Sequence, residues 1–378
     1  MRKDWEYKKL GEVANVVMGQ SPDGSNVNNE NGMEFHQGKI NFGEQFLMKS
    51  DCFTTQVTKV AEKGSILLCV RAPIGIINIT DRDICIGRGL CAIKEKTEVD
   101  NLFLYYYLLN KKLYFEKNST GSTFKAISSK VVLHTPIFLP PKPTQLAIVA
   151  ELDKLNEMIR LKKQQLEDYD QLAQSIFYEM FGDPVENEKG WEVKKYGDLF
   201  TIGSGGTPSK AKEEYWNNGD IPWIGSNMCQ NRIIYKTDGK YITKEGLNNS
   251  SAKLLMPGTI LVALVGATIG KVALLKTETT TNQNIAFIKV NETKEFMPEY
   301  VYYFLMNQYN EFLNIGNGNF KMANLSFIKG LFITKAPLPL QQQFAARIEA
   351  IERQKQQVSE TIKDLETLLA SRMQYWFD

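Results

Sequence analysis

The sequence predicts an α+β protein with two similar β-rich domains, each followed by one long helix, and with the two helices paired antiparallel. Three observations predict this class: an internal repeat, short β-branched runs between glycines and prolines, and two long segments with heptad spacing of apolar residues. The chain has 378 residues, of which 43% are hydrophobic and 23% are charged. These values are typical of a folded protein with two or three domains, and they exclude a disordered or collagen-like chain.

The two halves of the chain share motifs in the same order. Residues 5–12 (WEYKKLGE) recur as 191–198 (WEVKKYGD), 64–68 (GSILL) as 258–262 (GTILV), and 141–145 (PKPTQ) as 337–341 (PLPLQ). The offset grows between the first and second pairs and then stays nearly constant, as expected when loops absorb insertions. The halves therefore share one fold, and they differ most between residues 18–63 and 204–257.

In each half, strands come first and helices follow. Short β-branched runs bounded by glycine or proline predict strands at residues 66–70, 74–79, 260–265 and 271–275. Residues 101–115 and 299–313 are apolar and long enough to be helices packed on the sheets. Their aromatic runs, at 105–107 and 302–304, are interpreted as core residues rather than base-stacking residues.

Two heptad seams give the clearest physical signal. Mostly apolar residues recur at alternating steps of four and three from 148 to 180 and from 344 to 376, which predicts a coiled coil. The seam from 148 to 180 spans about 50 Å at about 1.5 Å per residue, more than one turn of B-DNA at about 34–36 Å. Separate packing of each helix on its own domain is the alternative. The residues expected to pair the helices or dock subunits are Ile148, Leu152, Leu155, Leu166, Tyr169, Ile348, Ile351, Ile362, Leu365 and Leu369.

These patterns predict four segments: a first domain (1–144), a first spacer helix (145–183), a second domain (184–340) and a second spacer helix (341–378). Residues 1–144 and 187–340 each carry a net charge of +4, whereas the helical segments are acidic. Two mildly basic domains permit nucleic-acid binding without requiring it. Uneven solvated surface is the alternative explanation of the charge.

Several chemistries are excluded by what the sequence lacks. No window approaches 18 uncharged apolar residues and the N-terminus lacks a signal-peptide core, so we expect no membrane span and a cytoplasmic protein. Five cysteines without metal-ligand spacing and two unmatched histidines predict no metal site and no catalytic residue. Residues 266–271 (GATIGK) approach a phosphate loop, but Val272 stands where Ser or Thr is needed, which favours a turn between strands.

Further short motifs accompany the repeat: GTPS at 206–209, IPWI at 221–224, TNQN at 281–284 and GSTF at 121–124. Their order, together with two globular units that each precede a Pro-x-Pro-x-Gln helix, resembles the specificity subunit of type I restriction–modification systems over essentially the whole chain. The first unit departs from this pattern, because residues 19–22 (GQSP) replace Gly-x-Thr-Pro-Ser and no Ile-Pro-Trp segment is evident.

The resemblance implies two target recognition domains related by pseudo-twofold symmetry, each of which reads one half of a bipartite site in double-stranded DNA. It also implies that the helices hold the domains apart and dock two methyltransferase subunits, and it leaves open whether two restriction subunits bind. No cofactor is expected in this chain, because S-adenosylmethionine, ATP and Mg²⁺ would belong to the partner subunits.

DNA contacts are expected in the polar, glycine-rich stretches of each domain. Arg and Lys suit guanine edges, Asn and Gln suit adenine edges, and Ser, Thr and Lys hold phosphates. A Phe-Lys pair recurs at 124–125 and 320–321, which favours a shared phosphate contact for its two lysines. At every candidate, an ordinary solvated loop residue is the alternative. The candidates are Gln20, Ser21, Lys39, Arg71, Arg88 and Lys125 in the first domain, and Ser209, Lys210, Lys212, Ser226, Asn227 and Lys321 in the second.

The leading hypothesis is thus a non-catalytic DNA-specificity subunit. The specificity portion of a fused restriction–methylation enzyme is one alternative, and a duplicated scaffold that joins proteins without binding DNA is another. Because the chain begins with a domain-opening motif and ends within the second helix, we expect a standalone subunit.

Overall fold

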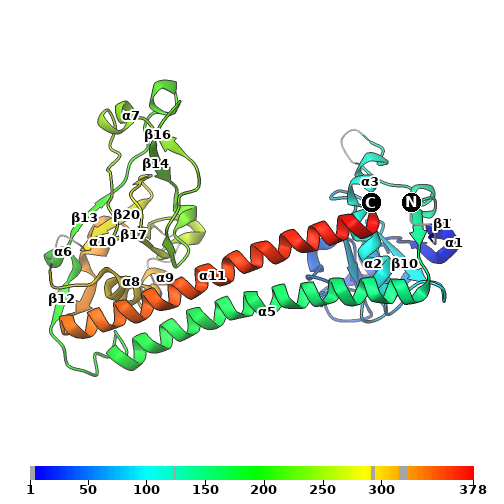
Figure 1. Ribbon diagram of the computed structural model, residues 1–378, viewed down its shortest axis with the longest axis horizontal. Helices are drawn as coiled ribbons and strands as arrows, with labels where there is room; N and C mark the ends of the chain where they lie inside the picture. Colours follow the sequence, from blue (N-terminus) through cyan, green and yellow to red (C-terminus); the bar gives the residue numbers. More distant parts are fainter. Residues whose placement is uncertain (1–4, 122–124, 291–293, 315–321) are drawn as a thin grey trace. The chain divides into compact units, whose positions relative to one another are not determined.

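The computed structural model describes residues 5–121, 125–290, 294–314 and 322–378. The chain forms two compact units (Figure 1): Met1–Lys163 together with Glu360–Asp378, and Gln164–Ser359. Each unit therefore contains one β-rich domain and about half of each long helix.

The first unit contains a four-stranded antiparallel sheet in the order β2-β10-β7-β8, a five-stranded mixed sheet in the order β3-β5-β4-β9-β6, and the pair β1-β11. Its strands are β1 (Glu6–Lys9), β2 (Ala14–Met18), β3 (Val27–Asn28), β4 (Met33–His36), β5 (Phe53–Thr54), β6 (Val60–Ala61), β7 (Ile66–Cys69), β8 (Ile77–Ile79), β9 (Ile84–Ile86), β10 (Leu90–Glu95) and β11 (Pro136–Leu139). Its helices are α1 (Leu10–Val13), α2 (Asn101–Asn110), α3 (Lys112–Lys117) and α4 (Ser129–Leu133), with 3₁₀ turns η1 (Gly24–Asn26) and η2 (Lys39–Asn41).

The second unit repeats this arrangement with a five-stranded sheet β13-β20-β17-β18-β15, a three-stranded sheet β16-β14-β19, and the pair β12-β21. Its strands are β12 (Val193–Lys195), β13 (Thr201–Ser204), β14 (Ile221–Ile224), β15 (Arg232–Ile234), β16 (Tyr241–Ile242), β17 (Thr259–Ala263), β18 (Val272–Leu275), β19 (Thr280–Thr281), β20 (Ile285–Lys289) and β21 (Phe332–Thr334). Its helices are α6 (Tyr196–Leu199), α7 (Lys244–Asn248), α8 (Pro298–Asn307), α9 (Tyr309–Leu313) and α10 (Leu325–Gly330), with 3₁₀ turns η3 (Glu213–Tyr215), η4 (Ser226–Met228) and η5 (Gly266–Thr268).

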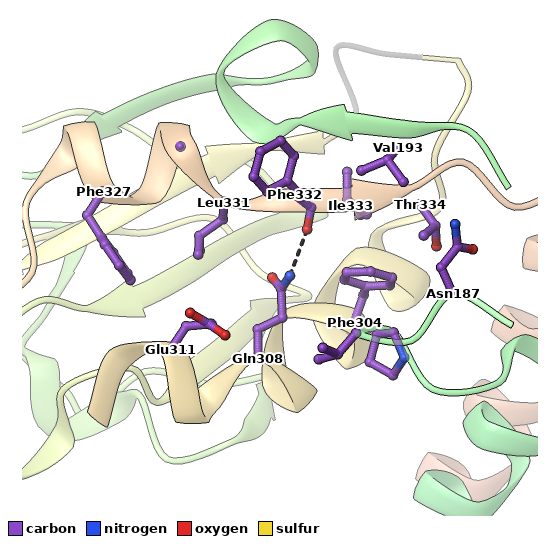
Figure 2. A pocket seen from close by; sticks show the side chains of 13 residues that line it. Asn187, Val193, Phe304, Gln308, Glu311, Phe327, Leu331, Phe332, Ile333 and Thr334 are labelled. Atoms are coloured by element: carbon purple, nitrogen blue, oxygen red, sulfur yellow. Dashed lines mark hydrogen bonds between the residues drawn. The ribbon is translucent and has the colours of Figure 1, made fainter. Parts of the chain in front are cut away.

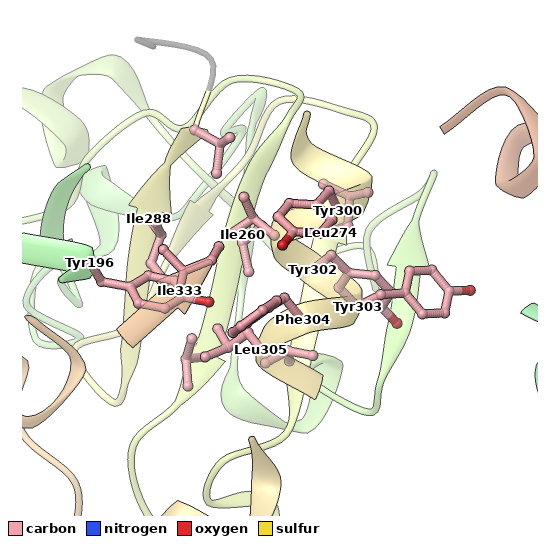
Figure 3. Packing of buried hydrophobic residues seen from close by; sticks show 14 of the residues in the cluster. Tyr196, Ile260, Leu274, Ile288, Tyr300, Tyr302, Tyr303, Phe304, Leu305 and Ile333 are labelled. Atoms are coloured by element: carbon pink, nitrogen blue, oxygen red, sulfur yellow. The ribbon is translucent and has the colours of Figure 1, made fainter. Parts of the chain in front are cut away.

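The core of the second unit lies between helix α8 and the face of the large sheet (Figure 3). Tyr300 and Phe304 are buried against Ile260 and Ile288, and the Tyr300 hydroxyl donates a hydrogen bond to the carbonyl oxygen of Thr334 (2.9 Å). In the first unit, the Tyr107 hydroxyl, one helical turn further along α2, donates to the carbonyl oxygen of Pro136 (3.0 Å). The aromatic runs at 105–107 and 302–304 are buried, which confirms their interpretation as core.

Each predicted helix after the sheet is in fact two helices. Residues 101–115 divide between α2 and α3 at Lys111, and residues 299–313 divide between α8 and α9 at Gln308. At both positions ψ is close to zero, at 11° and 13°, so the α-helical hydrogen-bond ladder is interrupted. The Lys111 amine donates to the carbonyl oxygen of Phe377, and the Gln308 amide donates to that of Phe332. The apolar pattern continues through the break, which explains why one helix was predicted.

The glutamine of the Pro-x-Pro-x-Gln motif ties each long helix to its domain. The buried Gln145 side chain accepts a hydrogen bond from the backbone N–H of Asp100 (2.8 Å) and donates to the carbonyl oxygens of Glu98 and Pro140. Gln341 accepts from Met297 (2.8 Å) and donates to Glu295 and Ala336 in the same way. Because each buried side-chain amide forms three hydrogen bonds to its domain, it fixes the start of the helix firmly.

The two long helices are α5 (Lys142–Phe181) and α11 (Leu338–Phe377), and they pack antiparallel in each unit. In the first unit, the Arg372 guanidinium pairs with Glu151, and Lys163 lies 3.2 Å from Glu366. In the second unit, Lys355 lies 2.6 Å from Asp170, and the rings of Phe177 and Phe344 are 5.6 Å apart. As residue numbers rise along α5, those of the partner residues fall along α11.

The expected seam residues lie along this contact. Ile148, Leu152 and Ile348 are almost fully buried, whereas Leu166, Tyr169 and Leu369 are half-buried. The predicted fold class, with two β-rich α+β domains and two long antiparallel helices, is therefore confirmed. Among the residues that the structure describes, no helix is both long and apolar enough to span a membrane.

Candidate nucleic-acid interface

One edge of the first domain gathers most of its candidate DNA-contact residues. The backbone N–H of Gln20 donates to the carbonyl oxygen of Ile86 (3.0 Å), and that of Arg88 donates to the Ser21 hydroxyl (3.3 Å). The segment that contains Gln20 and Ser21 therefore lies against the turn that precedes β10. Gln20 and Arg88 are exposed, so their side chains are accessible to a ligand.

Two further segments extend this edge. The backbone N–H of Val70 donates to the carbonyl oxygen of Gly89, and that of Ile127 donates to Val70, both at 2.9 Å. Arg71 follows Val70 and pairs with Ala126 in a β-bridge, so exposed Arg71 and Lys125 lie on neighbouring segments. We call residues 19–21, 70–71, 87–89 and 125–127 the first loop edge.

Lys39, in η2, lies close to the same edge. Burial raises the pKa of the Cys69 thiol to about 12, and the positive charge of Lys39 opposes that shift. Cys69 is the last residue of β7 and directly precedes Val70. Five of the six candidates of the first domain therefore lie on neighbouring segments of one edge, and Lys39 lies near the end of β7.

Glycines allow the segments of this edge to approach closely. A Cβ atom on Gly19 would lie 2.2 Å from the carbonyl oxygen of Gly87, and one on Gly89 would lie 2.1 Å from that of Gln37. Such distances are far inside van der Waals contact, so only glycine fits without moving the backbone.

The second domain has the same hydrogen bonds at its corresponding edge. Gly206 donates to the carbonyl oxygen of Thr281 (2.8 Å), Leu264 donates to Asn284 (2.9 Å), and Ala323 donates to Leu264 (2.9 Å). These bonds match those of Gln20, Val70 and Ile127 one for one. We call residues 205–207, 264–265, 282–284 and 322–323 the second loop edge.

Paired parallel strands hold both edges. In the second domain, β14 lies beside β19 with Trp223 opposite Thr280. In the first domain, β4 lies beside β9 with Phe35 opposite Cys85. The first domain therefore does have a counterpart of the IPWI segment, residues 33–36 (MEFH). It is not evident from the sequence, because the two segments share a position in the sheet and not a residue pattern.

A charged network fixes β4 in the first domain. Arg82 donates two 2.6 Å hydrogen bonds to the Glu34 carboxylate, and the Ser50 backbone N–H donates a third (2.7 Å). Burial alone would raise the pKa of Glu34, but these hydrogen bonds, one from His36 and the Arg82 charge outweigh it and lower the pKa to about 2. The network is structural, because its donors and acceptors satisfy one another.

Gln283 lies on the second loop edge but is not among the candidates expected from the sequence. The Thr207 hydroxyl donates to the Gln283 side-chain oxygen (2.6 Å), and the Gln283 side chain is exposed. The signal that could have found it was the TNQN motif itself, read together with the adenine preference of glutamine.

The remaining candidates of the second domain divide into two groups. Ser226 and Asn227 begin η4 directly after β14, and the backbone N–H of Asn282 donates to Ile224 (3.1 Å), which places η4 beside the second loop edge. Ser209, Lys210 and Lys212 lie on the exposed segment after Pro208.

Two tryptophans connect that segment to the edge. Trp216 donates from its indole to the carbonyl oxygen of Ser209 (3.1 Å), its ring lies 5.3 Å from that of Trp223, and Trp223 donates to Gly206 (3.1 Å). The Lys212 amine donates instead to the Tyr215 hydroxyl (2.9 Å). Lys321 and residues 122–124 of the GSTF motif lie outside the described residues.

Residues 266–271 form a turn between β17 and β18, through η5, which confirms the prediction of a turn rather than a phosphate loop. The Lys271 amine donates to the Gln230 side chain (3.1 Å). In the described part of the chain, no group of three or more His, Cys, Asp or Glu residues is arranged to hold a metal ion.

The second unit also contains a largely apolar pocket of about 540 Å³ between α8, α9 and β21 (Figure 2). Phe304, Phe327 and Phe332 line it, and the Gln308 amide donates to the carbonyl oxygen of Phe332 (2.7 Å). None of the candidate DNA-contact residues that the structure describes lines this pocket.

Comparison with known proteins identifies the family. The model of the type I restriction modification DNA specificity domain matches residues 2–168 and 188–367. A chain assigned to the MjaX type I restriction enzyme of Methanocaldococcus jannaschii as specificity subunit is 38% identical over 178 residues, 46% of this chain and 42% of that protein. The MjaIX specificity subunit of the same organism is 24% identical over 92% of this chain and 87% of its own length.

Two solved structures share the fold. The type I restriction–modification S subunit from M. genitalium has a TM-score of 0.56 at 15% identity, covering 99% of this chain and 96% of its own. A chain from a study of complex assembly and conformational transition of the type I system has a TM-score of 0.62 at 18% identity, covering 100% and 98%. Because the family model matches both halves and most of the chain, this protein belongs to the type I restriction–modification specificity subunits, which are non-catalytic components.

Proposed function

We propose that each domain of this chain reads one half of a bipartite site in double-stranded DNA through its loop edge. The observation that carries the proposal is the duplication of the edge: matching hydrogen bonds hold matching exposed polar segments in both domains. Two similar recognition surfaces with different side chains suit a target with two different halves.

We further propose the division into domains at 1–144 and 184–340, with spacer helices at 145–183 and 341–378. In this proposal the helices set the distance between the half-sites at about 1.5 Å per residue of helix. They also offer two similar surfaces for two methyltransferase subunits, which supply S-adenosylmethionine chemistry, with restriction subunits using ATP and Mg²⁺ where they are present. Cytoplasmic DNA is the expected substrate of the complex.

A domain exchange tests the proposal. Residues 187–340 are replaced by the corresponding domain of another specificity subunit, and the methylated motif is determined by methylome sequencing of cells that contain the complex. One half of the motif should change and the other should persist. A motif that changed in both halves, or in neither, would contradict independent reading.

Salt dependence separates DNA recognition from the scaffold alternative. Binding of the assembled complex to a duplex that contains the motif should weaken with salt, at a slope near −0.9 per phosphate contacted. Substitution of Lys210 or Asn227 should weaken only the second half-site. A complex that assembles but binds no DNA at low salt would favour the scaffold.

A further inference from the structure

Arg88 and Gln283 occupy equivalent positions in the two domains. In the paired strands, Cys85 lies opposite Phe35 and Thr280 lies opposite Trp223. Arg88 and Gln283 each come three residues after that strand position. The backbone bonds agree, because Ile86 and Thr281, two residues before them, accept equivalent hydrogen bonds from Gln20 and Gly206.

Both side chains are exposed and both are accompanied by a hydroxyl residue. Ser21 follows Gly19 by two residues, as Thr207 follows Gly205, and each contacts its partner: Ser21 through the Arg88 backbone N–H, and Thr207 through the Gln283 side-chain oxygen. Within the described parts of the chain, the Arg88 guanidinium and the Gln283 amide nitrogen form no hydrogen bond or ion pair. Their donors are therefore available to a ligand.

The two side chains suit different base edges. Arginine donates two hydrogen bonds to O6 and N7 of guanine, whereas glutamine donates to N7 and accepts from N6 of adenine. By contrast, Lys125 and Lys321 are identical at their recurring motif. A contact that is the same in both half-sites needs the same residue, and a contact that distinguishes them needs different ones.

We propose that Arg88 and Gln283 are specificity-determining residues at the corresponding position of the two half-sites. Arg88 contacts a guanine in the first half-site and Gln283 contacts an adenine in the second, with Ser21 and Thr207 as positioning residues. The inference rests on the proposed function, because it requires that the loop edges face DNA.

Exchange of the two residues tests the inference. The variants Arg88→Gln and Gln283→Arg are produced in cells with the methyltransferase subunits, and the methylated motif and the affinity for duplexes with single base changes are measured. Arg88→Gln should change one guanine of the first half-site to adenine, with a loss of roughly 5- to 150-fold for the original base. Gln283→Arg should cause the reverse change in the second half-site, and each variant should leave the other half unaltered.

Charge-matched controls lie at the opposite ends of the same sheets. Lys63→Gln removes one positive charge before β7, and Met256→Arg adds one before β17; both residues are exposed. Both controls should leave the motif unchanged. Arg88→Ala is a second variant, which should lose the preference at one base pair while the rest of the motif persists.

The outcomes are distinct. If the unaltered chain directs methylation of no bipartite motif, the proposed function fails and the inference fails with it. If the unaltered chain does so but Arg88→Gln and Arg88→Ala weaken all sequences equally, or change nothing, the proposed function stands and the inference is overturned. Equal weakening would identify Arg88 as a phosphate contact.

Discussion

Replacement of Gln341 by alanine should destabilise the second unit strongly although the residue is not a candidate DNA contact. The Gln341 side chain is fully buried and makes three hydrogen bonds, to the backbone groups of Met297, Glu295 and Ala336. These bonds connect the start of α11 to the start of α8 and to the segment after β21. Alanine would leave all three backbone groups without their partner.

The expected cost follows from the burial of each group. The Ala336 carbonyl bond is buried, so leaving that oxygen unpaired costs about 1–3 kcal/mol. The Met297 and Glu295 bonds are partly buried, so water replaces some of each loss, at about 0.5–1 kcal/mol apiece. Together, the free energy of unfolding should fall by about 3 kcal/mol.

Urea unfolding followed by circular dichroism gives the stability, and amide hydrogen exchange locates the change. Exchange should rise in α8 and at the start of α11 but not in the first unit. The adjacent Gln342 is exposed and provides the matched control, since Gln342→Ala should cost less than about 0.5 kcal/mol. Gln145→Ala should act on the first unit as Gln341→Ala acts on the second. If Gln341→Ala unfolded at the same urea concentration as Gln342→Ala, the anchoring role of the motif would be wrong.

Three further predictions concern the first unit and the helix seam. Because the pKa of Glu34 in the folded state is about 2, below its unfolded value, the stability that its ionised form contributes should be present above pH 4.5 and lost as the pH falls toward 2. Glu34→Gln should flatten this part of the stability curve measured by urea unfolding. Gly19→Ala should lower the affinity for the first half-site in a binding assay, whereas Gly24→Ala, whose Cβ would meet nothing within 4 Å, should bind as the unaltered chain does. Leu155→Asp and Ile351→Asp should each lower the free energy of unfolding, measured by thermal unfolding, by several kcal/mol and impair assembly with methyltransferase subunits. Leu161 lies at an exposed position of the helix that contains Leu155, so Leu161→Asp should be nearly neutral. Equal effects at Leu155 and Leu161 would exclude a buried seam.

The repeat and the heptad seam could be predicted because they depend on local spacing. Apolar steps of four and three identify α5 and α11 wherever their partners lie, and the recurring Pro-x-Pro-x-Gln motif marks both helix starts. The break at Lys111 could not be predicted, because the apolar pattern runs through it and the partner of the Lys111 amine, Phe377, lies more than 260 residues away in the sequence.

The candidate site likewise contains one residue that local sequence identifies and one whose role depends on contacts between distant segments. Arg88 was found because it is a cation in a glycine-rich stretch, whereas Gln283 was missed because the repeat offset places it opposite Arg88 only to within a residue or two and no side-chain type is shared. Their equivalence depends on the partners of β9 and β19, and the first of these strands shares no residue pattern with the second. The MEFH strand was missed for the same reason, since Phe35 and Trp223 share only a position opposite a neighbouring strand.

The first unit is built from two segments that are far apart in the sequence, and this affects the order in which the protein folds during synthesis. Residues Met1–Lys163 leave the ribosome first, but their domain includes Glu360–Asp378, and Phe377 packs its ring against Phe103 and Tyr107 at 5.7 and 5.6 Å. The second unit, Gln164–Ser359, is continuous in the chain and is synthesised in between. At about 5–20 residues per second, the N-terminal domain waits about 10–40 s with part of its aromatic core uncovered. The domain that is made first is therefore completed last, and it is the one exposed to premature association with other nascent chains.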